Sequence, residues 1–136
     1  MPPSAYPDLS TVRLTGKALV VDDEVDLLEI ATTYLSQLGY TTLRADNGPN
    51  ALKIAEQNRD IDLIVTDIIM PGGMNGVEFA EKVHQYLPHV KLIYCSGFPA
   101  NALTERGLPQ VDRPILQKPY LRAEFGAMVA AVMEGR

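Results

Sequence analysis

The chain has 136 residues, of which 46% are hydrophobic and 21% charged, and its 12 basic and 17 acidic residues give a net charge of −5. This composition excludes a disordered segment, a collagen-like repeat and a small disulfide-stapled scaffold, and the length fits one domain with one core. The acidic balance argues against binding through nucleic-acid phosphates, so we expect no direct nucleic-acid partner.

The predicted location is the cytoplasm. The single cysteine, Cys95, cannot form an internal disulfide, which is typical of a reducing compartment. No stretch approaches the roughly 20 apolar residues of a membrane span. Residues 1–8 lack the basic and apolar regions of a secretory signal. We therefore expect a cytoplasmic protein without a membrane partner.

Residues 1–16 are rich in Pro, Ser and Thr without a regular period, which indicates a flexible tail or linker. After them, short apolar runs predict buried strands at 18–21, 41–45, 61–66, 90–95 and 114–117. Helical spacing predicts helices at 27–38, around 51–55, at 77–87 and at 121–132, with a short helix in the irregular segment 100–106. Gly39 is the expected stop of the first helix, and Asn47 or Asn50 the expected cap of the second.

Five strands that alternate with helices predict a doubly wound α/β domain, in which a five-stranded parallel sheet carries five helices on its two faces. Parallel strands are buried on both faces, which explains why the predicted strands are apolar throughout rather than alternating. Because the last predicted helix ends close to the end of the sequence, we expect no second domain.

Polar side chains follow four of the predicted strands. The first strand ends at Asp22 and Asp23, the third at Asp67, the fourth at Ser96 and the fifth at Lys118. Because the carboxyl ends of parallel strands share one edge of the sheet, these side chains are expected to meet there. Each alone has an ordinary explanation as a helix cap, a turn or a solvated loop residue, but their coincidence at four strand ends favours a functional site.

Three carboxylates held close together repel one another and require a cation. Carboxylate oxygens are ligands that suit Mg²⁺, and Mn²⁺ can take the same ligands. Together with Lys118, a divalent ion balances the charge of the three carboxylates. An entering phosphoryl group would then meet a neutral site rather than an anionic one.

These residues lie in motifs that resemble the response-regulator receiver domain. The motifs are Val20-Val21-Asp22-Asp23-Glu24, Thr66-Asp67-Ile68-Ile69-Met70-Pro71, Cys95-Ser96-Gly97 and Lys118-Pro119-Tyr120. The resemblance covers about residues 17–133 and implies a receiver domain at 17–134 after the tail of 1–16. It also implies a CheY-like, flavodoxin-like fold with strand order 2-1-3-4-5 and a role in two-component signal transduction.

The resemblance assigns the phosphoryl chemistry to three side chains. Asp67 resembles the phosphoacceptor, which attacks a phosphohistidine of a sensor histidine kinase or a phosphotransfer protein. Ser96 resembles the hydroxyl that moves to a phosphoryl oxygen, and Lys118 the cation that pairs first with Asp67 and then with the phosphoryl group. The resemblance also implies a cis peptide before Pro119 and a shifted surface formed by residues 97–117 and the last helix.

The resemblance assigns Mg²⁺ to four residues. Asp23 resembles the direct carboxylate ligand, and Asp22 acts mainly through a bound water. Asp67 and the backbone carbonyl of Ile69 complete the set. Because only its carbonyl is used, the side-chain type of Ile69 is free.

Three features depart from the commonest receiver pattern. The loop at 70–76 has one extra glycine, which we expect to be absorbed locally. Ser96 stands in place of threonine, and Ile115 stands where many receivers have an aromatic switch residue, so the route of switching is open. The loop and Lys118-Pro119-Tyr120 most resemble receivers of hybrid sensor kinases, and a stand-alone receiver is the other reading. We expect a monomer or a weak dimer.

Three other functions use residues that partly match this pattern. A phosphohydrolase with an aspartyl-phosphate intermediate expects a second Asp two residues after Asp67, where this chain has Ile69. A nucleotide-binding Rossmann domain needs a Gly-rich turn after the first strand, where Asp22-Asp23-Glu24 would repel a pyrophosphate. A pseudo-receiver that binds partners without phosphorylation should have lost a member of the cluster, and none is missing. We expect a phosphoacceptor rather than an enzyme with a separate substrate.

Overall fold

The computed structural model describes residues 16–99, 102, 105 and 115–134. Their elements are, in chain order, β1 (Gly16–Val21), α1 (Val25–Leu38), β2 (Tyr40–Ala45), α2 (Gly48–Gln57), β3 (Leu63–Asp67), α3 (Gly76–Tyr86), β4 (Lys91–Ser96), β5 (Ile115–Gln117) and α5 (Arg122–Met133). Four helices are described against five predicted. The predicted helix at 100–106 lies largely outside the described residues. Within this range the structure describes Ala102 and Glu105, and both have helical backbone. No described helix is long and apolar enough to cross a membrane.

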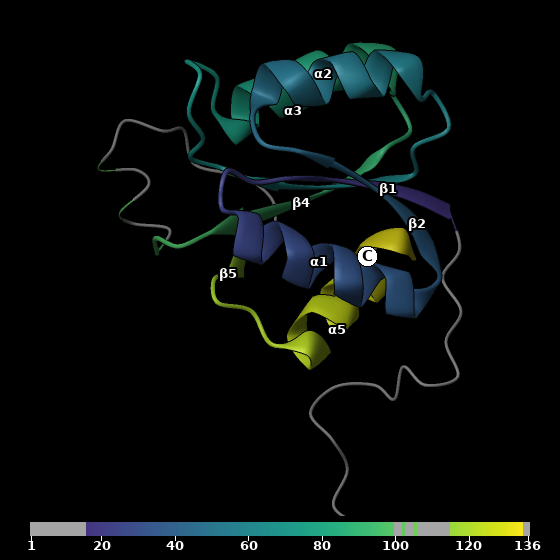
Figure 1. Cartoon of the computed structure of the whole chain (residues 1–136), viewed down its shortest axis with the longest axis vertical. Helices are drawn as coiled ribbons and strands as arrows, with labels where there is room; N and C mark the ends of the chain where they lie inside the picture. Colours follow the sequence, from purple (N-terminus) through teal and green to yellow (C-terminus); the bar gives the residue numbers. More distant parts are fainter. Residues whose placement is uncertain (1–15, 100–101, 103–104, 106–114, 135–136) are drawn as a thin grey trace, which may run out of the picture.

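The strands form one parallel sheet in the order β2-β1-β3-β4-β5, as predicted. Figure 1 shows that α1 and α5 cover one face of this sheet and that α2 and α3 cover the other. The central strand β3 is buried along its whole length. This double cover explains the uninterrupted apolar runs in the sequence.

Alternate side chains of the strands enter two separate cores. Leu19 of β1 packs under α2 and α3 with Phe79, whereas its neighbour Val20 packs under α1 and α5 with Phe125. Fully burying an aliphatic or aromatic side chain of this kind contributes about 1.5–3 kcal/mol. The two cores fix the sheet between its helices and so fix the strand ends at its carboxyl edge.

Local chemistry sets the ends of the helices. Gly39 ends α1 with a φ of 112°, a left-handed conformation that favours glycine, as predicted. Asn47 caps α2, because its side-chain oxygen accepts a hydrogen bond of 2.8 Å from the backbone N–H of Asn50. Asn75 and Glu78 form a capping box at the start of α3, which the sequence analysis did not identify.

Candidate functional site

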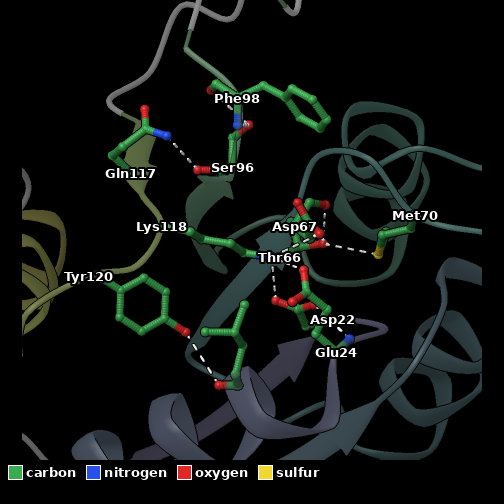
Figure 2. A network of polar contacts seen from close by, with 11 residues as sticks. Asp22, Glu24, Thr66, Asp67, Met70, Ser96, Phe98, Gln117, Lys118 and Tyr120 are labelled. Atoms are coloured by element: carbon green, nitrogen blue, oxygen red, sulfur yellow. Dashed lines mark hydrogen bonds and ion pairs between the residues drawn. The ribbon is translucent and has the colours of Figure 1, made fainter.

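The sheet delivers four polar residues to its carboxyl edge. Asp22 directly follows β1, Asp67 and Ser96 are the last residues of β3 and β4, and Lys118 directly follows β5. Because β3 lies between β1 and β4, and β5 lies beside β4, their ends are neighbours. Figure 2 shows Lys118 reaching across toward Asp67 and Asp22. The predicted meeting of these side chains at one edge is present in the structure.

Three carboxylates form the acidic centre of this edge. One oxygen each of Asp22, Asp23 and Asp67 lies within 4.8 Å of the other two. Asp22 and Asp67 are buried, with 4% and 7% of their surface exposed, whereas Asp23 is exposed. At such distances two carboxylates repel by roughly 3–4 kcal/mol at an effective dielectric of about 20. An all-carboxylate donor set of this kind suits Mg²⁺ or Mn²⁺.

Lys118 is the cation at the centre of the acidic group. Its Nζ lies 2.7 Å from a carboxylate oxygen of Asp22 and 3.0 Å from one of Asp67, and its side chain is only 5% exposed. Burial by itself lowers the pKa of Lys118, but the hydrogen bonds and attraction of the two carboxylates outweigh burial, so the pKa lies above its ordinary value. The following peptide bond to Pro119 is cis, as expected.

Asp67 is a buried carboxyl whose ionisation is disfavoured. Burial raises its pKa to about 6, the nearby charge of Asp22 adds to the increase, and the Lys118 ammonium opposes it. The backbone amide of Ile69 also hydrogen-bonds the carboxylate and favours its charged form. At pH 7 the group is therefore mostly ionised, yet it is more basic than an aspartate on the surface.

Ser96 belongs to the same edge, but its hydroxyl is bound elsewhere. The Oγ donates a hydrogen bond of 3.0 Å to the carbonyl of Phe98 and accepts one of 2.9 Å from the backbone N–H of Phe98. The carbonyl of Ser96 accepts from the backbone N–H of Lys118 at 2.8 Å, which joins the ends of β4 and β5. A hydroxyl has one proton to donate, and here that proton is directed toward the loop after β4.

The loop between β3 and α3 passes close under Asp67. A Cβ at Gly76 would collide with the backbone carbonyl of Asp67, so the close return of the chain requires glycine. The backbone N–H of Gly76 donates to the carbonyl of Ile68 at 2.7 Å. Gly72 and Gly73 have left-handed φ values of 90° and 78°, and these two turns accommodate the extra glycine of the loop.

Two residues at the site were not assigned by the sequence analysis. A carboxylate oxygen of Glu24 lies 3.8 Å from the Lys118 Nζ, and its backbone N–H donates to the Asp22 carboxylate at 2.9 Å. Its position directly after two aspartates was the available signal. The side-chain amide of Gln117 donates to the carbonyl of Ser96 at 3.0 Å. Nothing in the sequence distinguishes this Gln117 from a solvated glutamine.

Comparison with known proteins agrees with this geometry. The model of the response regulator receiver domain family matches residues 18–130. The response regulator receiver protein CpdR of Brucella abortus (strain 2308) is 31% identical over 104 residues, which cover 76% of this chain and 85% of CpdR. The sensor kinase CckA of the same organism is 30% identical over 125 residues, which cover 89% of this chain and 13% of the kinase.

A solved structure shows the same fold. The crystal structure of the receiver domain from the hybrid histidine kinase CckA is 32% identical, covers 87% of this chain and 99% of that chain, and superposes with a TM-score of 0.71. The chain thus has relatives among both response regulators and sensor kinases, and of the kinase it spans only a small part. From the match over most of its length, the chain belongs to the response regulator receiver domain family of two-component signal transduction.

Proposed function

We propose that Asp67 accepts a phosphoryl group from a phosphohistidine of a sensor histidine kinase or a histidine phosphotransfer protein. The observation that supports this role most directly is the position of its carboxylate, held by the Lys118 ammonium beside the carboxylates of Asp22 and Asp23. The sensor kinases among the relatives support the choice of donor. The chain would be the acceptor of the group rather than an enzyme that turns over a separate substrate.

We infer that Mg²⁺, or Mn²⁺ in its place, is held by Asp23, Asp67 and the backbone carbonyl of Ile69, with Asp22 acting mainly through water. The donor set fits such an ion, because three carboxylate oxygens converge within 4.8 Å and Lys118 pairs with two of the three carboxylates. When bound, the ion supplies positive charge that offsets the charge of the phosphoryl oxygens.

The transfer exchanges one bond to phosphorus for another. An oxygen of the Asp67 carboxylate forms a P–O bond as the P–N bond to the histidine breaks, and the electron pair of that bond returns to the imidazole nitrogen. The carboxylate form is required for attack, and a pKa of about 6 leaves Asp67 mostly in that form at neutral pH. Lys118, already 3.0 Å from Asp67, then needs only a short movement to pair with the transferred group.

Ser96 would bind a phosphoryl oxygen after the transfer. Its hydroxyl proton is directed to the Phe98 carbonyl, so this contact requires a rotation that breaks the hydrogen bond to Phe98. The transfer would therefore loosen the start of the loop after β4. That loop begins the surface of residues 97–117 and α5, through which we expect the signal to leave; most of its residues 100–114 lie outside the described part.

The entrance of the site has apolar side chains that suit a protein donor. Val25 at the start of α1 is 65% exposed, and Leu121 before α5 is 66% exposed. Val25 directly follows Glu24, whose carboxylate approaches Lys118, and Leu121 directly follows Tyr120, which hydrogen-bonds the carbonyl of Leu27 in α1. Large exposed apolar side chains beside a reactive carboxylate favour docking of a folded partner over use of a free small molecule alone.

Intact-mass measurement with a small phosphodonor tests the proposal. Phosphoramidate, whose P–N bond mimics phosphohistidine, should add the mass of one phosphoryl group to the chain in the presence of Mg²⁺ and none in chelator. Asp67→Asn should add none. Asp60→Asn, a matched change of an exposed carboxylate that pairs with Lys17, should label as the natural chain does. Equal labelling of Asp67→Asn, or full labelling in chelator, would contradict the assignment.

A further inference from the structure

The outer edge of β2 is an open edge of the sheet. The strand order places β2 outermost, and among the described residues only β1 pairs with it. Its six residues, Tyr40–Ala45, contain neither proline nor glycine. Such an edge leaves a row of backbone N–H and C=O groups to which a further strand can be added. Figure 1 shows β2 at the side of the sheet, between the layers of α1 and α2.

Two grooves of different chemistry flank this edge. The groove between α1 and β2 has a volume of ≈ 360 Å³ and is lined by hydroxyl and amide side chains together with Arg44: Thr32, Thr33, Ser36, Gln37 and Thr42. The second groove has a volume of ≈ 500 Å³ and crosses the end of β2, with lining residues from α1, β2 and α2. Its more buried lining is apolar, from Leu28, Ala45 and Ile54, and Lys53 lies at its exposed rim.

Arg44 lines both grooves and Lys53 lines the second, so two cations lie at this edge of a molecule whose net charge is −5. Arg44 donates a hydrogen bond of 3.0 Å to the Thr32 hydroxyl, and neither cation takes part in an ion pair among the described residues. Asp46, the acidic residue of the grooves, accepts a hydrogen bond from Asn50. An exposed cation on an edge strand disfavours apolar and basic strands, but an acidic strand neutralises it.

We propose that the edge of β2 binds an extended acidic segment of a partner protein as a sixth strand of the sheet. Alternate side chains of an added strand point to opposite faces. One set meets the hydroxyl-lined groove and Arg44 on the α1 face, while the other set meets the α2 side of the second groove at Ile54. Carboxylates fit the first groove, and aliphatic side chains fit the second. The segment is therefore one in which acidic and aliphatic residues alternate over about the length of β2.

A synthetic peptide tests this surface. The probe is acetyl-Ser-Glu-Val-Glu-Val-Glu-Val-Ser-amide, titrated into the isotope-labelled full chain and followed by amide chemical shifts. Shifts should centre on Tyr40–Ala45 and the two grooves, and binding should weaken with added salt. Arg44→Glu should weaken binding about tenfold or more. Lys82→Glu, the same charge reversal on the exposed side of α3, should leave it unchanged.

Four outcomes would overturn the proposal. Shifts away from β2 would show that no strand is added. Equal binding by two further peptides, one with proline in place of the central valine and one with proline in place of the glutamate before it, would show the same, because one of these two N–H groups must face β2 and proline lacks it. Binding only after removal of residues 1–15 would assign the edge to the chain's own segment, and concentration-dependent shifts of β2 without peptide would assign it to a second copy. If Arg44→Glu does not fold, Lys53→Glu provides the same test. Asp67→Asn should bind the peptide as the natural chain does. The peptide proposal can therefore hold even if the phosphoacceptor assignment fails.

Discussion

Asp67 is a residue whose charged form destabilises the folded chain at the pH at which the proposed phosphoryl transfer would need it. Its pKa lies at about 6, above the ordinary 3.8, so the folded chain binds the proton more tightly than the unfolded chain between these values. Stability is therefore lost as the pH rises from about 4 through about 6, and the loss is complete above that range. A shift of this size corresponds to about 1–3 kcal/mol at neutral pH.

Replacement of Asp67 by a neutral side chain should therefore stabilise the folded chain above pH 6. In chelator at pH 7.5, Asp67→Asn should be more stable than the natural chain by about 1–3 kcal/mol, because it removes a buried carboxylate that faces Asp22. At pH 3.5, where Asp67 is protonated in the folded chain and mostly protonated in the unfolded chain, the difference should become small. Urea unfolding at the two pH values measures it. A variant that is less stable than the natural chain at pH 7.5 would show that the Lys118 pairing outweighs burial.

At the scale of an element, the loop between β3 and α3 depends on Gly76 more than on its other glycines. Gly76→Ala should destabilise the chain by more than about 2 kcal/mol, because its Cβ would meet the backbone of Asp67 and Ile68, which the core holds fixed. Gly73→Ala is the matched control. Its φ of 78° costs roughly 1–2 kcal/mol in an alanine, but open space surrounds the position. Urea unfolding should separate the two variants, and equal losses would contradict the close approach at Gly76.

The loop after β4 gives a second prediction at this scale. The Mg²⁺–beryllofluoride complex stands in for a phosphoryl group on Asp67, and it should draw the Ser96 hydroxyl away from Phe98. The Phe98 amide, which now donates to that hydroxyl at 2.9 Å, should then exchange its hydrogen faster. Ser96→Ala should show fast exchange with and without the complex. Unchanged hydrogen exchange of the Phe98 amide in the natural chain would show that the conformational change does not pass through this loop. Ile115 offers no replacement for an aromatic switch residue, because its β-branched side chain is restricted in χ1.

At the scale of the whole molecule, the sheet and its polar edge could be predicted because four of the five apolar runs end at polar residues that meet at one edge of the sheet. Some boundaries of the strands and helices differ from those predicted. The third strand was expected from Ile61 but begins at Leu63, and α1 begins at Val25, two residues early, because Val25 is exposed and adds nothing to the apolar period. The hydrogen bonds of Ser96 to Phe98 and of Gln117 to Ser96 depend on side-chain rotamers. Sequence spacing says nothing about rotamers, so the state of the hydroxyl could not be predicted.

Because the site joins the ends of four strands, its charge balance should affect the stability of the entire chain. Without metal, Lys118 is the buried cation that pairs with Asp22 and Asp67, and breaking such a buried pair costs about 3–5 kcal/mol. Lys118→Ala should therefore unfold at a much lower temperature in chelator. Lys118→Arg, which keeps a cation, should lose less.

Mg²⁺ should partly restore the thermal stability of Lys118→Ala, since a divalent ion neutralises the same carboxylates with which Lys118 pairs in the natural chain. Binding to the folded state alone stabilises by about 2.7 kcal/mol at 100 times Kd, and the gain should exceed that of the natural chain because no lysine competes for the carboxylates. Thermal unfolding against Mg²⁺ concentration measures both gains, and Asp23→Ala should show little gain because it removes a proposed metal ligand. A smaller gain in Lys118→Ala than in the natural chain would mean that the lysine and the metal cooperate rather than compete at this edge.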